Sequence, residues 1–301
     1  MSFSSEVKNE LCRQSIGKRC CALAEAYGAL LYGNCFSASL IRFITASDAF
    51  AQRLPKLFSR AFGVAFDQLS GTETAGKRSL SITDADKIAR VFDAFGCDAA
   101  LLLAHHINRP VVESECDRQA FLRGAFLAGG SVTDPARRYH LELATAHAGV
   151  CRETHALLLE MGFEPKDAAR GGVRLTYFKQ SAAIEDFLTT IGAPLGAMEL
   201  MQAKVEKDMT NAMNRLTNCD MANADKVTRS AAGQLDAIRA VEAGPGLDSL
   251  PPALQETALL RIANPACSLA DLAQLSFPPV TKSCMAHRLR KLVEYAQKLE
   301  S

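Results

Sequence analysis

The sequence lacks a long apolar run, an export segment and an excess of charge of either sign. No stretch reaches the roughly 18 apolar residues that a membrane-spanning helix needs. The opening residues do not combine a basic start, an apolar core and a small-residue cleavage site. We therefore expect a cytoplasmic protein without a membrane partner. The formal net charge of +1 also means that any binding to nucleic acid must come from local basic patches.

Spaced metal-ligand motifs are missing as well. The ten cysteines are scattered, with Cys20 and Cys21 adjacent and no C-x-x-C pair anywhere. Disulfide scaffolds are typical of short secreted chains, so we interpret these cysteines as reduced thiols. His105 and His106 lie in a predicted turn, and the spacing of the other histidines never gives a helical i, i+4 pair. We expect no metal site and no cofactor.

The sequence does contain enough apolar material for two or three compact domains, since 48% of its 301 residues are hydrophobic. Two segments, residues 20–95 and 117–191, follow the same order of predicted elements. In each, the helix after the long strand ends at a glycine that tolerates a positive φ, Gly63 or Gly162. This agreement predicts a duplicated α+β fold. The alternative is two unrelated α+β stretches of similar length.

The elements of the two copies are predicted from apolar periodicity and capping residues. In the first copy they are a helix over 19–33, a strand over 40–45, a helix over 48–62, strands near 65–69 and 79–82, and a helix capped by Asp84. In the second they are a helix through Gly129, a strand over 139–145, a helix to Met161, a strand over 173–178 and a helix closing at Ile191.

A run of small and apolar residues, 121–131, forms the first helix of the second copy. Gly124, Ala128 and Gly129 would let a second helix approach closely. Alignment of the two copies sets Gly33 against Gly129, and neither residue can supply a carboxylate. The nearest acid, Asp134, is predicted to form a turn instead.

The segment over about 200–241 is predicted to be a helix that a cluster of asparagines interrupts. Asn211, Asn214, Arg215 and Asn218 follow i, i+3, i+4 and i+7 spacing, so a helix would gather them on one face. Asparagine is a poor helix former. Two interpretations stay open: capping and turn chemistry around a broken helix, or contacts to a nucleic-acid backbone.

The tail begins with a predicted hinge over 243–252, which holds two glycines and three prolines. Three short helices follow. The first carries Leu254, Ala258, Leu259 and Ile262, and the second starts at a capping-box pattern, Ser268 to Asp271. The third has Thr281 as its cap and a core stripe of Met285, Leu289, Leu292 and Ala296.

The last helix is basic outside its core stripe, as in a helix-turn-helix reader of DNA. We predict that seven of its residues contact DNA: Thr281, Lys282, Ser283, His287, Arg288, Arg290 and Lys291. The alternative is a solvated three-helix bundle.

Three motifs carry a resemblance to a known family. Residues 121–131, Phe-Leu-Arg-Gly-Ala-Phe-Leu-Ala-Gly-Gly-Ser, resemble the LAGLIDADG motif of homing endonucleases. Residues 211–223 match the pattern N-x-x-N-R-x-x-N-C-x-x-A-N of the bacterial WhiA family, and residues 281–292 resemble that family's recognition helix, commonly S-K-S-G-V-N-H-R-L-R-K-L. The chain departs from the family at Thr210, where arginine is usual, and at Cys284, Met285 and Ala286.

The resemblance covers almost the full length and implies a duplicated LAGLIDADG homing-endonuclease-like domain followed by an all-α helix-turn-helix domain. The predicted boundaries are 1–110 and 111–198 for the two LAGLIDADG-like repeats, 199–242 for the helical Asn-rich connecting segment, 243–252 for the hinge and 253–301 for the helix-turn-helix domain. In LAGLIDADG enzymes the positions of Gly33 and Gly129 hold acids that bind divalent metal ions. The resemblance therefore implies that this domain is not catalytic.

The function implied is that of a sequence-specific DNA-binding transcriptional regulator of sporulation, development, or cell division and chromosome segregation. Its expected partner is double-stranded promoter DNA, with Asn211, Asn214, Arg215 and Asn218 as additional contacts. The resemblance further implies nucleoid association and, in some relatives, a WhiB-type partner. The alternatives are an active LAGLIDADG homing endonuclease and a nonspecific chromosome-associated scaffold.

Overall fold

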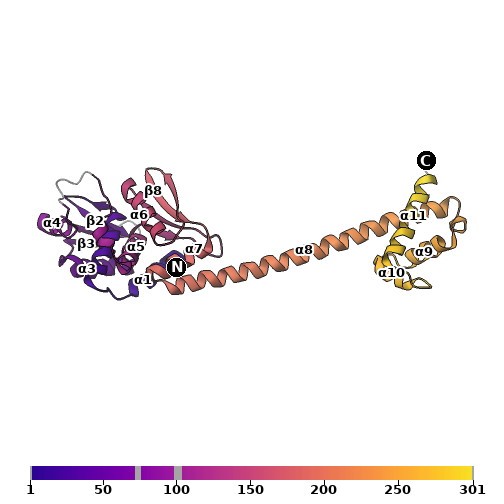
Figure 1. The fold of residues 1–301 in the computed structure, drawn as a ribbon, viewed down its shortest axis with the longest axis horizontal. Coiled ribbons are helices and arrows are strands. Elements are labelled where there is room, and N and C mark those ends of the chain that lie inside the picture. The colour runs from indigo at the N-terminus through magenta and orange to yellow at the C-terminus, as the bar shows by residue number, and fades with distance from the viewer. Residues whose placement is uncertain (1, 72–75, 98–103, 300–301) are drawn as a thin grey trace. The chain divides into compact units, whose positions relative to one another are not determined.

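The computed structural model describes residues 2–71, 76–97 and 104–299, and they form two compact units, residues 1–208 and 209–301 (Figure 1). The boundaries expected at 198/199, 242/243 and 252/253 stay predictions of the sequence, whereas the compact units divide at 208/209. None of the helices in the described part of the chain is long and apolar enough to cross a membrane.

The first unit opens with one helix and then contains the two copies in succession. The elements up to the end of the first copy are α1 (Phe3–Arg13), α2 (Arg19–Leu31), β1 (Cys35–Phe36), β2 (Ile41–Thr45), α3 (Asp48–Phe62), β3 (Gln68–Gly71), β4 (Arg78–Ile82) and α4 (Ala85–Asp93). The second copy has the 3-10 turn η1 (Arg109–Val112), α5 (Glu115–Gly129), β5 (Gly130–Val132), β6 (Leu141–Thr145), α6 (Ala148–Glu160), β7 (Lys166–Arg170), β8 (Val173–Phe178) and α7 (Ser181–Ile191).

The two copies share one sheet topology, which confirms the duplication. The strand order is β1-β2-β4-β3 in the first sheet and β5-β6-β8-β7 in the second, with every pair antiparallel. The predicted glycines at the ends of the helices that follow the long strands are confirmed too: Gly63 and Gly162 have φ values of 69° and 86°. The Asp84 side chain accepts from the amide of Lys87 at 3.0 Å, as an N-cap should.

The helices α2 and α5 pack directly against each other at the centre of this unit. A Cβ at Gly28 would lie 2.0 Å from the carbonyl oxygen of Phe121, and a Cβ at Gly124 would lie 1.9 Å from that of Glu25. No side chain fits at such distances, so glycine is required at both positions. Because Gly28 and Gly124 are 96 residues apart, as are Gly33 and Gly129, the contact confirms the alignment of the two copies.

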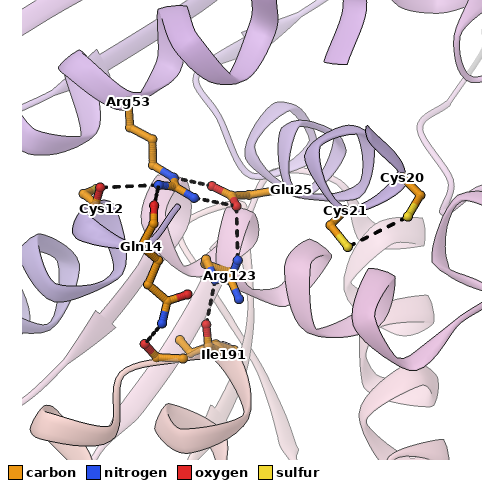
Figure 2. A network of polar contacts seen from close by, with 9 residues as sticks. Cys12, Gln14, Cys20, Cys21, Glu25, Arg53, Arg123 and Ile191 are labelled. Atoms are coloured by element: carbon orange, nitrogen blue, oxygen red, sulfur yellow. Dashed lines mark hydrogen bonds and ion pairs between the residues drawn. The ribbon is translucent and has the colours of Figure 1, made fainter. Parts of the chain in front are cut away.

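A buried network of charged and polar groups joins the two copies (Figure 2). Arg53 of α3 forms a bidentate pair with Glu25 of α2, at 2.6 and 2.9 Å, and both side chains are almost fully buried. Arg123 of α5 reaches the same carboxylate at 3.3 Å and donates to the carbonyl of Ile191 at 2.7 Å. The guanidinium of Arg53 also donates to the carbonyl of Gln14 at 2.6 Å. Each buried charge is therefore neutralised or hydrogen-bonded.

The helix α8 (Pro194–Ala243) is continuous, so the predicted interruption by asparagines is wrong. Its side chains from 209 to 230 are exposed, and an exposed asparagine costs a helix only a few tenths of a kcal/mol to about 0.7 kcal/mol. That cost is small beside the hydrogen bonds of a 50-residue helix.

The second unit packs the end of α8 against three short helices. They follow the 3-10 turn η2 (Leu247–Ser249) and are α9 (Pro252–Ala263), α10 (Leu269–Leu275) and α11 (Lys282–Leu299). Its core takes Ile238 and Val241 from α8, Leu250 from the predicted hinge, and the stripe of Met285, Leu289, Leu292 and Ala296 from α11. The predicted stripe of α11 is thereby confirmed.

The predicted core face of α9 is partly wrong. Leu259 and Ile262 are 53% and 42% exposed, whereas Thr257, Ala258 and Arg261 are buried. The buried guanidinium of Arg261 donates to the carbonyl of Cys267 at 2.7 Å and so holds the loop between α9 and α10. Apolar spacing alone pointed to Leu259 and Ile262 in place of Arg261, because a buried arginine that donates to backbone carbonyls leaves no apolar signal.

Candidate nucleic-acid interface

The helix α11 exposes its basic face on the side opposite its core stripe. It begins where the hydroxyl of Thr281 accepts from the amide of Cys284 at 3.2 Å, which confirms the predicted cap. Six of the seven predicted contact residues are exposed: Thr281, Lys282, Ser283, His287, Arg290 and Lys291. Helical spacing places Ser283, His287 and Arg290 on one side of α11, with Lys282 and Lys291 flanking them. The start of a helix also favours a phosphate oxygen.

The side chains of His287 and Arg290 are hydrogen-bonded to each other on this exposed face. The Arg290 guanidinium lies 2.8 Å from Nδ1 of His287 and donates to it, because arginine has no acceptor. The second ring nitrogen, Nε2, lies on the other side of the imidazole from this contact. Arg290 also lies 3.8 Å from Glu294, an exposed pair that neutralises little of its charge.

Arg288, the seventh predicted residue, is half-buried and forms an ion pair with Glu256 of α9 at 3.4 Å. The same carboxylate accepts from the amide of Phe277 at 2.9 Å and from the hydroxyl of Ser276 at 3.1 Å. The bond from the Phe277 amide is the main reason that the pKa of Glu256 lies below its ordinary value. Arg288 is therefore part of a set of polar contacts, centred on Glu256, that joins α9, the turn before α11 and α11 itself.

The turn between α10 and α11 positions the exposed face. The capping box predicted at Ser268 and Asp271 is present, and the amide of Val280 donates to the carbonyl of Ala273 at 2.9 Å. Within this turn the ring of Phe277 is 92% exposed beside the start of α11. The signal for this exposed ring in the sequence is an aromatic residue next to two prolines, Pro278 and Pro279.

The asparagine cluster lies on α8 and is separate from the face of α11. Asn211, Asn214, Arg215 and Asn218 are all exposed on one side of the helix. The part of α8 that faces α11 begins at Arg229, where it lines a groove with Ala286 and Arg290. Asn218 precedes Arg229 by 11 residues, or about 16 Å of helix. The structure thus gives two separate predicted contact surfaces in the second unit.

The positions that hold acids in LAGLIDADG enzymes are crowded by neighbouring atoms, more severely at Gly129 than at Gly33. A Cβ at Gly129 would lie 2.4 Å from the carbonyl oxygen of Ala144 and 3.0 Å from that of Tyr32. A Cβ at Gly33 would lie 2.9 Å from the carbonyl oxygen of Ala29. The positions without carboxylates are therefore also positions where backbone carbonyl oxygens lie close to the glycine. Asp134 forms the predicted turn, since its carbonyl accepts from Arg137 and its side chain from the amide of Ala136.

Two family models match the chain. Residues 118–210 match the WhiA LAGLIDADG-like domain, and residues 213–296 match the WhiA C-terminal HTH domain. Among curated proteins, the probable cell division protein WhiA of Ruminiclostridium cellulolyticum is 35% identical over 307 residues, which is 99% of this chain and 98% of the relative. The protein of the same name from Desulfitobacterium hafniense strain Y51 is 36% identical over 309 residues, 100% of this chain and 97% of the relative.

Solved structures show the same fold. The full-length DUF199/WhiA from Thermatoga maritima superposes with a TM-score of 0.62 at 24% identity and covers 99% of both chains. The N-terminal LAGLIDADG domain of DUF199/WhiA superposes with a TM-score of 0.52 at 22% identity, covering 64% of this chain and 92% of that one. At these identities the likeness concerns the fold alone.

Proposed function

The chain belongs to the WhiA family, and on that premise we propose that it is a sequence-specific DNA-binding transcriptional regulator. The observation that carries the proposal is the exposed face of α11, on which Lys282, His287 and Lys291 follow a capped helix start. A helix of this kind presents its early residues to base edges in the major groove, while flanking lysines and arginines neutralise phosphates.

Within this proposal the residues of α11 have different roles. Ser283 and His287 read base edges, since both are exposed near the start of α11 and His287 has a second ring nitrogen besides the one that contacts Arg290. Lys282, Arg290 and Lys291 contact phosphates. Arg288 positions the helix through its ion pair with Glu256 and remains a proposed DNA contact. Thr281 fixes the helix start.

The asparagine face of α8 supplies additional contacts in this proposal. Asn211, Asn214 and Asn218 are exposed amides, and Arg215 adds one charge. Amide side chains commonly bind phosphate and sugar oxygens, which fixes the register of a protein on a duplex without reading sequence.

The LAGLIDADG-like unit acts in this proposal as a scaffold without catalysis. Gly33 and Gly129 have no side-chain oxygen to bind a divalent ion, and a Cβ at either position would lie under 3.0 Å from a backbone carbonyl oxygen. The processes served are those implied by the relatives' name and by the resemblance: cell division and chromosome segregation, or sporulation and development. Nucleoid association and a WhiB-type partner belong to the same proposal by analogy.

Binding of the full-length chain to promoter fragments and to shuffled fragments of equal length, over a range of salt concentrations, tests the proposal. A regulator should prefer a subset of promoters by at least about 10³-fold over shuffled DNA. Equal affinity for all fragments with a steep salt dependence would instead indicate a nonspecific chromosome scaffold. Cleavage of any fragment in the presence of magnesium would indicate an active endonuclease.

A further inference from the structure

The starts of α2 and α5 bring together three thiols and a carboxylate. The part of the chain that the structure describes holds one such group, made by Cys20 and Cys21 of α2 and Cys116 and Asp117 of α5. One ligand atom from each of the four residues lies within 4.8 Å of every other. Figure 2 shows the two thiols of α2 side by side at the first turn of the helix. The sequence separates the two halves of this group by almost 100 residues.

The duplication explains why these four side chains meet. Cys20 and Cys116 are 96 residues apart, and so are Cys21 and Asp117. This is the same offset that relates Gly28 to Gly124, the two glycines at which α2 and α5 touch. Equivalent positions of the two copies therefore face each other, and each helix contributes a pair of adjacent ligands.

The distances suit a tetrahedral ion with sulfur and oxygen ligands. The Sγ atoms of Cys20 and Cys21 are 3.9 Å apart, and Sγ of Cys116 is 3.7 Å from Oδ1 of Asp117. Zinc bonds of about 2.3 Å to sulfur and about 2.0 Å to oxygen give tetrahedral edges of about 3.5–3.8 Å. Both measured edges join neighbours on one helix and are close to that range, while the edges between the helices are at most 4.8 Å. An ion would therefore draw the two pairs together by up to about 1 Å.

The surroundings also favour a filled site. Ser114 is the N-cap residue of α5, yet its hydroxyl makes no capping bond and hydrogen-bonds to the Asp117 carboxylate. A hydroxyl that hydrogen-bonds to a carboxylate ligand, without binding the metal itself, orients that ligand. Three thiolates and a carboxylate around a divalent cation leave a net charge of about −2, which the positive ends of two helices stabilise. Cys20 and Cys116 are exposed, so an ion can enter from solvent.

We propose that Cys20, Cys21, Cys116 and Asp117 bind one thiophilic divalent cation of the Zn²⁺ class, which ties together the starts of α2 and α5. Thiolate ligands select zinc-like ions over Mg²⁺ and Ca²⁺, which take oxygen ligands. With four protein ligands the site is closed and structural, since no position remains for a reacting water. The site lies at the opposite ends of α2 and α5 from Gly33 and Gly129, so it is independent of the positions of nuclease metals.

Cobalt titration of the reduced, metal-free full-length chain tests the proposal. We expect one equivalent of Co²⁺ to bind with the d–d bands of a tetrahedral centre and a thiolate charge-transfer band, and Zn²⁺ to displace it. Zn²⁺ should also raise the Tm of the wild-type chain. Cys20→Ser combined with Cys21→Ser should abolish both effects. Cys219→Ser, which removes an exposed cysteine from the second unit, should leave both unchanged.

A conservative replacement keeps the test independent of folding. Asp117→Cys should retain one equivalent of cobalt and increase the charge-transfer absorbance by about one third, because thiolates rise from three to four. Absence of the tetrahedral spectrum in the reduced wild-type chain would overturn the proposal, as would a spectrum that survives the double serine variant. A disulfide between α2 and α5 that forms equally with and without Zn²⁺ would also overturn it.

Discussion

Gly28 and Gly124 face each other across α2 and α5, and each lies against the backbone of the opposite helix. An added Cβ would lie 2.0 Å from a carbonyl oxygen at the first position and 1.9 Å at the second. The contact is reciprocal, because Gly28 meets Phe121 and Ala125 while Gly124 meets the equivalent residues of the first copy, Glu25 and Ala29. This pseudo-twofold contact fixes which residues of the two copies meet along the whole helix pair.

Gly124→Ala should therefore destabilise the chain. The overlap is with backbone atoms that cannot move aside, so we expect a loss of about 3 kcal/mol or more in the free energy of unfolding. Gly233→Ala is the matched control, since Gly233 also lies inside a helix but a Cβ there meets nothing within 4 Å. It should be neutral or stabilising by up to about 1 kcal/mol. Thermal unfolding in which both variants shift equally would contradict the close helix contact.

Arg53→Met should cost about 3–5 kcal/mol, because it leaves the buried carboxylate of Glu25 without its bidentate partner. Arg78→Met is the control. Arg78 pairs with Asp48 at a similar distance of 2.8 Å, but both side chains are more than half exposed. Exposed pairs contribute less than about 1 kcal/mol. Denaturant unfolding of the two variants measures the difference, and similar losses would mean that Arg123 alone suffices for Glu25.

Lys291→Ala and His287→Ala should weaken DNA binding in different ways. Loss of the lysine should lower affinity for all sequences and reduce the slope of log K against log salt by about one, as expected for a phosphate contact. Loss of the histidine should cost about 1–3 kcal/mol on the preferred site and little on shuffled DNA. Lys298→Ala, in the last turn and about 16 Å of helix beyond His287, is the control. Identical effects of Lys291→Ala and Lys298→Ala would show that the exposed face of α11 is not the DNA-binding surface.

Glu256 should make the second unit sensitive to acid. Its pKa is lowered by the bond from the Phe277 amide, with the Ser276 hydroxyl and Arg288 adding to it. A depressed pKa in the folded state means that the stabilisation is present above the unfolded value of about 4.5 and is lost as the pH falls through the lower folded value. The Tm difference between wild type and Glu256→Gln should therefore be largest near neutral pH and shrink below about pH 4.5. A constant difference across that window would show that the carboxylate charge plays no part.

Arg288→Ala separates two roles of one residue. If Arg288 acts through Glu256, its removal and Glu256→Gln should lower the Tm by similar amounts, and the double variant should add little further. If Arg288 also contacts DNA, Arg288→Ala should weaken binding at a temperature where both variants are fully folded, whereas Glu256→Gln should not. If DNA affinity instead falls in both variants in parallel with their loss of stability, Arg288 has a positioning role alone.

Capping residues and glycines made much of the fold predictable. The helix over 48–62 and the cap at Asp84 match α3 and α4, since local hydrogen bonds and a positive φ set those ends. The strands β1 and β5 were missed because two or three residues carry too little pattern. The strand β7 was missed because all five of its residues are exposed and none is β-branched or aromatic. The helix α1 was missed as well, although Phe3, Val7 and Leu11 have helical spacing and are buried. The interruption of α8 was predicted from propensity alone, which is a weak guide on an exposed surface.

The candidate sites were predictable to different degrees. The exposed face of α11 followed from one helix and one core stripe, so local spacing was sufficient. The role of Arg288 could not be predicted, because its partner Glu256 lies on another helix. Cys116 and Asp117 showed no metal spacing by themselves. The alignment of Gly33 with Gly129 already paired Cys20 with Cys116, and that was the signal available in the sequence.

Selection of genomic fragments by the full-length chain, with magnesium present and with fragment ends sequenced, tests whether the chain is a sequence-specific regulator that does not cleave DNA. We predict that a limited set of promoter fragments is enriched, that the fragments are uncut, and that a variant with Lys282, Arg290 and Lys291 changed to alanine enriches none. Uniform recovery of all fragments, equal enrichment by the triple variant, or new fragment ends at a shared sequence would contradict it.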